Sequence, residues 1–181
     1  MTVHLEATNR RVDVIGEGID VALRARPLPL KDSDLVMRVL ADTGQSLVAA
    51  PSLLDECGVP SEPSDLEELP SMAHGRPEET FRWQLTGPAE ELTTIEHRPR
   101  YVSTDMMALR ASAVAGIGIV KLPLLMLDRQ IDAESLVRVL SDWLPQREMI
   151  HAVFTSRRHL LPAVRAFIDF LAERYASYEV A

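Results

Sequence analysis

Residues 105–123 read DMMALRASAVAGIGIVKLP, and this stretch decides the fold class. Its first part is almost entirely apolar, which predicts a largely buried helix over 105–115. Gly116 follows, and glycine readily takes the left-handed conformation that ends helices. The apolar run 117–122 then predicts a strand, which Pro123 stops. A helix, a glycine and a buried strand in this order indicate an α/β architecture with parallel strand pairing.

Outward from this stretch, short apolar or alternating runs predict further strands. These strands are expected at 3–7, 19–23, 35–40, 46–50, 81–85, 93–97, 101–103, 136–140 and 149–154. Helices are expected at 9–15, 51–57 and 160–175. A turn is expected at Thr43 and Gly44, and a polar surface loop with one helical turn at 60–70.

The composition is that of a folded domain of ordinary size or of two small lobes. The chain has 181 residues, of which 46% are hydrophobic and 25% charged. Its 19 basic and 27 acidic residues leave a net charge of −8, which argues against nucleic-acid binding by the chain as a whole. No apolar run reaches about 18 residues and residues 1–6 lack signal-peptide features, so we expect a cytoplasmic protein with no membrane contact.

Four blocks along the chain together resemble one protein family. They occur in family order and span nearly the whole sequence, and they are residues 11–24, 47–54, 105–123 and 161–171. In these blocks the chain resembles the C-terminal effector-binding domain of the LysR-type transcriptional regulators. The resemblance implies a two-lobed α/β fold like that of type 2 periplasmic binding proteins, with two crossover segments. Lobe one would comprise 1–45 and 150–181, and lobe two 46–149.

The resemblance also implies partners. A small-molecule effector would bind in the cleft between the lobes. Effector domains of this family pair side by side, so a homodimer or higher oligomer is expected, and the helix at 9–15 is one candidate face. The family contacts DNA through an N-terminal winged helix-turn-helix module, which this chain does not contain.

The chain departs from the family at its start. The first strand and helix of lobe one have no counterpart before Val3. That strand is central in the family's lobe, so its neighbours would be left with unpaired edges. Three explanations stay open at this point: the lobe pairs differently, a partner chain fills the gap, or the sequence is an excerpt of a longer protein.

Candidate site residues lie at the start of the helix 105–115. Ser103, Thr104, Asp105 and Met106 stand where a helix N-terminus offers unpaired N–H groups to an anion, and the resemblance places one wall of the effector cleft there. The alternative for the first three is ordinary capping, and Asp105 would itself repel an anion. Met106 and Met107 are read as pocket residues or as core, with core favoured for Met107.

The opposite wall would come from the N-terminal part. Arg24 and Arg26 follow a predicted strand, where α/β sheets place ligands, and a guanidinium can grip a carboxylate with two hydrogen bonds. They would otherwise be surface residues paired with nearby aspartates. Thr8 and Asn9 follow the strand 3–7 and match the cleft wall by resemblance, or simply cap the next helix.

Catalytic and metal chemistry are not indicated. The five histidines have no metal-ligand spacing, and the single cysteine, Cys57, lies beside Glu56 with no nearby cation. No nucleophile elbow, phosphate-binding loop or dinucleotide fingerprint is present. We therefore expect no metal, no cofactor and no enzyme.

The sequence favours an effector-sensing and dimerisation domain of a LysR-type regulator, binding a small molecule such as a carboxylate to control transcription. The alternative is a free-standing small-molecule-binding protein of the periplasmic-binding-protein fold. An enzyme that uses the cleft is a third hypothesis, and it has no residue pattern to support it.

Overall fold

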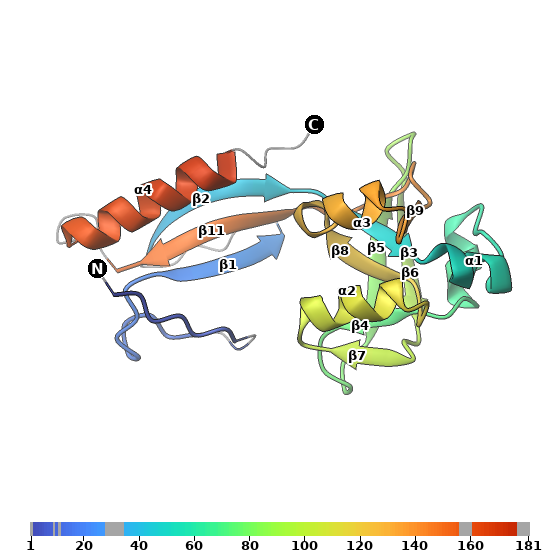
Figure 1. Cartoon of the computed structure of the whole chain (residues 1–181), viewed down its shortest axis with the longest axis horizontal. Helices are drawn as coiled ribbons and strands as arrows, with labels where there is room; N and C mark the ends of the chain where they lie inside the picture. The colour runs from blue at the N-terminus through green and yellow to red at the C-terminus, as the bar shows by residue number, and fades with distance from the viewer. Residues whose placement is uncertain (1, 9, 11, 28–34, 156–160, 177–181) are drawn as a thin grey trace. The chain divides into compact units, whose positions relative to one another are not determined.

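The computed structural model describes residues 2–8, 10, 12–27, 35–155 and 161–176. The chain divides into two compact units (Figure 1). Unit 1 comprises Met1–Thr43 and Arg147–Ala181, and unit 2 comprises Gly44–Gln146.

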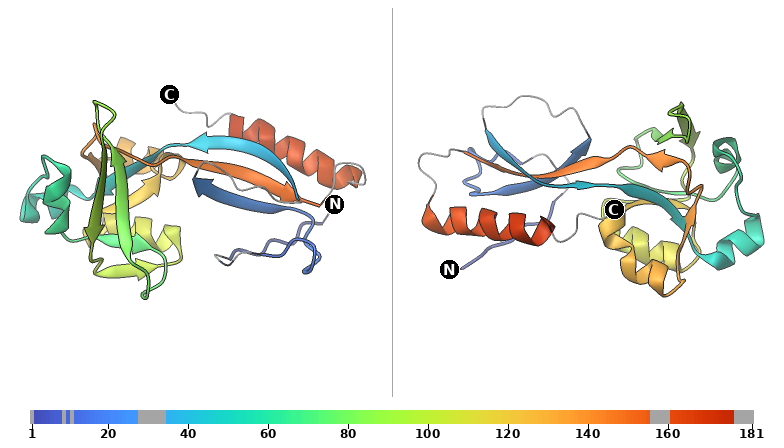
Figure 2. Two further views of the ribbon diagram at one scale, coloured as in Figure 1. Left: turned by 180° about the vertical axis from the view of Figure 1, so that it is seen from behind. Right: turned by 90° about the horizontal axis from the view of Figure 1, so that it is seen from above.

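Unit 1 is built on a three-stranded antiparallel sheet of order β1-β11-β2. Its strands are β1 (Ala22–Pro27), β2 (Val36–Thr43) and β11 (Glu148–Phe154). The helix α4 (Pro162–Ala176) lies along one face of this sheet, against β2 (Figure 2). An ion pair between Arg38 of β2 and Asp169 of α4 joins the two layers.

Unit 2 contains three small sheets. Strands β8 (Val120–Pro123) and β9 (Val137–Val139) flank β3 (Gln45–Ala49), both antiparallel to it. A second antiparallel sheet has the order β10-β5-β6 and consists of β10 (Leu144–Pro145), β5 (Phe81–Thr86) and β6 (Leu92–His97). The third sheet pairs β4 (Met72–His74) with β7 (Tyr101–Ser103) in parallel.

Short helices connect these strands. The α-helices are α1 (Pro51–Cys57), α2 (Met106–Val114) and α3 (Asp128–Asp132). Two 3₁₀ turns, η1 (Pro63–Glu67) and η2 (Leu124–Met126), complete the unit. None of the helices in the described part of the chain combines the length and the apolar composition needed to cross a membrane.

Strand β3 organises the core of unit 2 because all five of its residues are buried. Side chains alternate across a strand, so Leu47 and Ala49 enter one buried cluster and Val48 enters another. The first cluster includes Trp83. The two clusters together give unit 2 a core on both faces of its central strand.

Several sequence predictions are confirmed. Helix α1 has the expected bounds, since Pro51 sits in its first turn and Gly58 ends it at a φ of 89°. The 3₁₀ turn η1 lies in the loop 60–70. Strands β2, β3, β5, β6, β7, β9 and β11 and helices α2 and α4 all lie at their predicted places, with bounds shifted by up to a few residues.

The N-terminal predictions are wrong where the structure describes them. Residues 3–7 form no strand, and Leu5 is 89% exposed, because alternation alone does not make a strand without a pairing partner. Asn9 and Arg11 lie outside the described residues, and 14–18 form a turn where the end of a helix was expected. The Asp13 carboxylate accepts from the N–H groups of Ile15 and Gly16, which favours the turn.

Strand pairing also differs from prediction. Strand β8 runs antiparallel to β3, because its neighbour in the sheet is this distant strand and a hydrophobic run carries no direction. In the described part of the chain, parallel pairing is confined to β4 with β7 and to a bridge between Ser71 and Ile119. Thr43 and Gly44 join two strands that belong to different sheets, so they do not form a hairpin turn.

Candidate functional site

The start of α2 is a polar junction in unit 2. Parallel strands β4 and β7 end here with His74 opposite Ser103, and the N–H of Gly75 donates to the Ser103 carbonyl at 3.1 Å. The Ser103 hydroxyl accepts from the N–H of Asp105 at 3.0 Å. Two strand ends and a helix N-terminus therefore meet within a few residues.

Asp105 is the N-cap of α2. One of its carboxylate oxygens accepts from the N–H of Met107 at 2.8 Å and from that of Ala108 at 3.3 Å. Of the three capping candidates, the structure therefore assigns the cap to Asp105. A carboxylate in this place satisfies helix N–H groups that an anionic ligand would otherwise use.

Thr104 and His74 are exposed polar residues of the junction, as is Asp105. The His74 Nε2 lies 3.2 Å from the Thr104 carbonyl, and since a carbonyl can only accept, this nitrogen donates. His74 was not among the sequence candidates. The signal that would have identified it is the end of β4, a strand of three residues that was not among the predicted strands.

The methionines at the start of α2 differ in exposure. Met106 is half-buried, whereas Met107 is 54% exposed, so the expectation that Met107 belongs to the core is wrong. Only Leu109 and Ala113 are buried in this helix, because their spacing of four residues places them on one side. The prediction of a largely buried helix is corrected accordingly: its apolar residues are not confined to one face.

Arg24 and Arg26 lie within β1 rather than after it, because the strand runs from Ala22 to Pro27. An Arg24 guanidinium nitrogen donates to the Val12 carbonyl at 2.8 Å. Arg26 is exposed and donates to the carbonyl of Ala25 at 3.3 Å. Both arginines thus belong to the body of the sheet, although they stay cationic groups at its surface.

Arg24 stands directly opposite His151 on β11. His151 is buried, and its Nδ1 donates to the Met149 carbonyl at 3.2 Å. Burial lowers the pKa of His151, and the charges of Arg24 and Arg26 lower it further. This histidine therefore adds no positive charge beside the arginines near neutral pH.

The remaining N-terminal candidates are less informative. Thr8 is exposed, and its hydroxyl accepts from the N–H of Arg10 at 3.4 Å. Asn9 lies outside the described residues. The structure therefore brings Ser103, Thr104, Asp105 and Met106 together in unit 2, while Thr8, Arg24 and Arg26 belong to unit 1.

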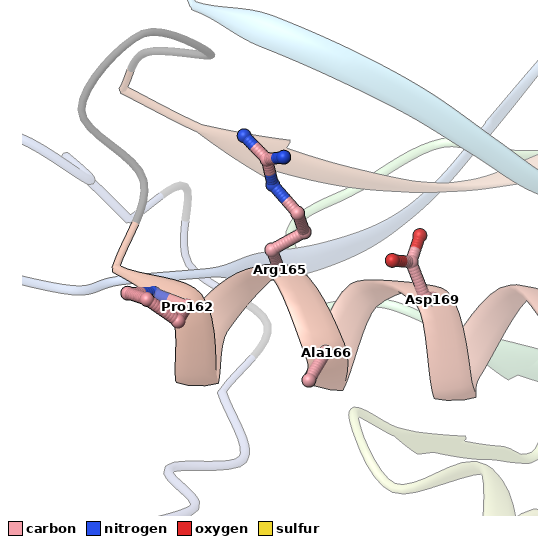
Figure 3. Close-up of a pocket in the computed structure, with 4 residues that line it drawn as sticks. All are labelled: Pro162, Arg165, Ala166 and Asp169. Atoms are coloured by element: carbon pink, nitrogen blue, oxygen red, sulfur yellow. The ribbon is translucent and has the colours of Figure 1, made fainter.

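A pocket that the sequence did not indicate lies on α4. It has a volume of about 390 Å³ and is lined by Pro162, Arg165, Ala166 and Asp169 (Figure 3). Arg165 and Asp169 project from the same side of the helix, one turn apart. Asp169 forms an ion pair with Arg38, so one of the charged residues that line the pocket already has a partner in the protein.

Metal ligands do not gather among the residues that the structure describes, since no three of His, Cys, Asp or Glu are placed to hold an ion. Cys57 is exposed at the end of α1. The buried histidine of unit 2, His97, stacks on Trp83 and shares a hydrogen bond of 2.8 Å with the Ser71 hydroxyl. Both members of this Ser–His pair are buried, since Ser71 is 2% and His97 5% exposed.

Comparison with known proteins identifies the family. The sequence profile described as the LysR substrate binding domain matches residues 1–176. An HTH-type transcriptional regulator of Haemophilus influenzae is 30% identical over 158 residues, which are 87% of this chain and 54% of that protein. The HTH-type transcriptional regulator PtxR of Pseudomonas aeruginosa is 31% identical over 173 residues, 94% of this chain and 54% of that protein.

Solved structures agree. The full-length virulence activator AphB of Vibrio cholerae superposes with a TM-score of 0.80 at 28% identity, covering 95% of this chain and 57% of AphB. The chain spans about half the length of the curated relatives it matches, and those relatives are transcriptional regulators rather than enzymes. Its fold is the α/β, two-lobed, periplasmic-binding-protein-like fold of LysR-type regulatory domains. The chain therefore belongs to the LysR-type transcriptional regulators, as an effector-binding regulatory domain.

Proposed function

We propose that this domain senses a small carboxylate and passes the signal to the rest of a transcriptional regulator. The observation that carries the proposal is the polar junction at the start of α2 in a chain of this family. There Ser103 ends β7 and Thr104 follows it, beside His74 at the end of the parallel strand β4. Strand ends and helix N-termini are where α/β folds bind small polar molecules.

The charge pattern limits what the ligand contacts. Asp105 is negative and its carboxylate caps the helix, so we assign ligand contact at the junction to the hydroxyls of Ser103 and Thr104 and to Met106. We assign the positive charge to Arg24 and Arg26, and we include Thr8 and Asn9 as further ligand contacts. In this proposal lobe one (1–45 and 150–181) corresponds to unit 1 and lobe two (46–149) to unit 2, although the boundaries of the units lie two or three residues earlier in the chain.

Regulation would follow from differential affinity. A ligand that binds one arrangement of the lobes, or of a homodimer, more tightly than another shifts the protein toward that arrangement. The curated relatives are named HTH-type regulators and are about twice as long as the matched region. We therefore assign DNA binding to a helix-turn-helix module outside these 181 residues, and the site of action to the cytoplasm.

The test is a thermal-shift and calorimetric screen of the purified chain with small aromatic and aliphatic carboxylates. A ligand that binds the native state raises Tm by mass action. Thr104→Val, which removes one hydroxyl and keeps the shape, should weaken the binding of a responding carboxylate about tenfold, the effect of one lost hydrogen bond.

The matched control is Thr94→Val, at an exposed position in the middle of β6. It should leave the affinity unchanged. If no carboxylate raises the Tm of the wild-type chain, the proposal of a carboxylate sensor is wrong. If Thr94→Val weakens binding as much as Thr104→Val, the assignment of the junction is wrong.

A further inference from the structure

The pocket on α4 takes no part in the proposed effector site. The described residues that line it are Pro162, Arg165, Ala166 and Asp169, and all four belong to unit 1 (Figure 3). Counted from Pro162, the others follow at three, four and seven residues along the helix, so the four form a single strip of its surface. The pocket is therefore a feature of unit 1 alone.

The two charged residues of this strip differ in their partners. The Asp169 carboxylate forms an ion pair with Arg38 of β2. An arginine and an aspartate four residues apart on a helix ordinarily pair with each other, yet Arg165 has no ion pair within the described part of the chain. Because β2 supplies the partner of Asp169, the exposed guanidinium of Arg165 is left with its hydrogen-bond donors facing solvent.

The charge around the pocket favours an anion with a single charge. Arg38 and Arg165 carry two positive charges against the one negative charge of Asp169, so one carboxylate would balance the group. Unit 1 as a whole does not repel an anion, because it has 11 basic and 11 acidic residues. Unit 2 has 8 basic and 16 acidic residues, and the net charge of −8 of the chain therefore belongs to unit 2.

The size and the lining of the pocket indicate the rest of the ligand. The volume is about 390 Å³, whereas a cavity of about 150 Å³ is enough to hold benzene. Pro162 and Ala166 offer apolar surface beside the guanidinium. Arginine binds a carboxylate through two parallel hydrogen bonds, because its planar donors match the two oxygens. The pocket thus suits a carboxylate that carries an apolar body.

We propose that the pocket on α4 binds a small monocarboxylate with an apolar body. The Arg165 guanidinium donates to the two carboxylate oxygens, and the apolar body lies against Pro162 and Ala166. Asp169 stays paired with Arg38, and its charge disfavours a ligand with a second negative group. This site shares no residue with the effector site proposed above and does not rest on that proposal.

Two variants remove the site in different ways. Arg165→Gln removes the charge, whereas Ala166→Leu fills the pocket and leaves the charge in place. The matched controls lie on the same helix outside the strip: Arg174→Gln for the first variant and Ala163→Leu for the second. All four positions are exposed, and glutamine and leucine are good helix formers, so each variant should keep the Tm of the wild type within a few degrees.

The probes are benzoate, its neutral counterpart benzamide, and inorganic phosphate, measured by calorimetry and thermal shift on the whole chain. Benzoate should bind the wild type. Arg165→Gln and Ala166→Leu should each weaken this binding about tenfold or more, whereas both controls should stay within about twofold of the wild type. Benzamide and phosphate should bind about tenfold more weakly or worse, because the first lacks the charge and the second lacks the apolar body.

The Thr104→Val variant separates this site from the proposed effector site, and it should leave the binding that depends on Arg165 in place. If Arg165→Gln binds benzoate as the wild type does, the pocket is not the binding site. A loss of binding in Thr104→Val at the same time would place benzoate in the effector site, so the proposed function would stand while this proposal falls.

The probes can overturn the proposal as well. If benzoate does not bind the wild type, or if benzamide binds as tightly as benzoate, the pocket does not recognise a carboxylate. If phosphate binds as tightly as benzoate, the apolar body plays no part and the assignment of a monocarboxylate is wrong. If Arg174→Gln and Ala163→Leu weaken binding as much as the two pocket variants, the effect belongs to the helix as a whole and not to the pocket.

Discussion

The two units bury their apolar residues very differently. Unit 2 has two clusters on either side of β3, with Leu47, Leu66, Leu109 and Leu122 at most 1% exposed. In unit 1 the helix α4 buries only Ile168. Apolar side chains of its strands and helix stay between 38% and 50% exposed, namely Leu23, Met37, Val39 and Phe170.

The difference shows that the length of a unit's helices and strands does not determine the stability of that unit. Helix α4 is amphipathic and long, yet a three-stranded sheet offers it little area to bury. Unit 2 has shorter elements but encloses them on both faces of a central strand. Since burial of apolar area is the main source of folding free energy, unit 1 should be the less stable unit.

Truncation of a core side chain in unit 2 should have the largest effect on the difference in stability between the units. Leu109→Ala in α2 should lower the free energy of unfolding of unit 2 by about 3 kcal/mol, because Leu109 is fully buried. Both tryptophans of the chain, Trp83 and Trp143, lie in unit 2, so their fluorescence follows this unit alone. Denaturant titration should show the fluorescence midpoint shifting to lower denaturant.

Two controls accompany this experiment. Val114→Ala, on the exposed side of the same helix, should change stability by less than about 1 kcal/mol. Ile168→Ala in unit 1 should shift the circular dichroism of α4 and leave the tryptophan midpoint in place. If Ile168→Ala moves both signals together, the two units unfold as one and the comparison does not hold.

Acid should weaken unit 2 through His97. Burial, together with the smaller effect of the Lys121 charge, lowers the pKa of His97 from an ordinary value of 6.5 to about 4. The unfolded chain takes up the proton as pH falls through 6.5, while the folded chain takes it up only near 4. Stability is therefore complete above 6.5 and declines as pH falls, by about 2 kcal/mol between pH 7 and pH 5.

The measurement is the fluorescence midpoint in urea at several pH values. His97→Gln should flatten the dependence contributed by unit 2. His151→Gln is the comparison variant in unit 1, and the pH dependence of the tryptophan signal should survive it. An unchanged slope in His97→Gln would mean that His97 is not the group responsible.

The sequence predicted those elements whose ends are marked by residues within the same segment. It did not predict features that depend on a distant part of the chain. Helix α1 was predicted with correct bounds because Pro51 and Gly58 mark its ends within the segment itself. The direction of β8 was not, because its partner β3 is more than seventy residues away and no periodicity records which way a neighbour runs. Family resemblance supplied the two-lobed architecture, which local patterns alone did not reach.

For the candidate site the limits were similar. The capping chemistry before α2 was predictable from residue types, but choosing Asp105 over its neighbours required the backbone geometry. His74 reaches the Thr104 carbonyl from a strand thirty residues away, so its place in the junction depends on packing. The ligand roles of Thr8, Asn9, Arg24, Arg26 and the residues 103–106 stay predictions.

Loss of the N-cap of α2 should lower the stability of unit 2 by a smaller amount than core truncation does. Asp105→Ala should lower the free energy of unfolding of unit 2 by about 1 kcal/mol, since two helix N–H groups lose their acceptor. Asp105→Asn keeps an acceptor oxygen and should recover most of this loss. Equal losses in both variants, measured by tryptophan fluorescence, would show that the charge of Asp105 rather than its capping oxygen stabilises the helix.

Removal of the exposed ion pairs should have the smallest effect on stability. The result shows whether surface charge contributes to the difference in stability between the two units. Unit 1 has Arg38 with Asp169, and unit 2 has Arg82 with Glu96 across β5 and β6. Both pairs are largely solvent-exposed, so double-mutant cycles to alanine should give a coupling of about 0.5 kcal/mol in each unit, decreasing with added salt. Similar couplings would mean that buried apolar area, not surface charge, makes unit 2 the more stable. A coupling above about 2 kcal/mol for Arg38 with Asp169 would instead make this pair the main attachment of α4 to its sheet, and unit 1 would then depend on ionic strength where unit 2 does not.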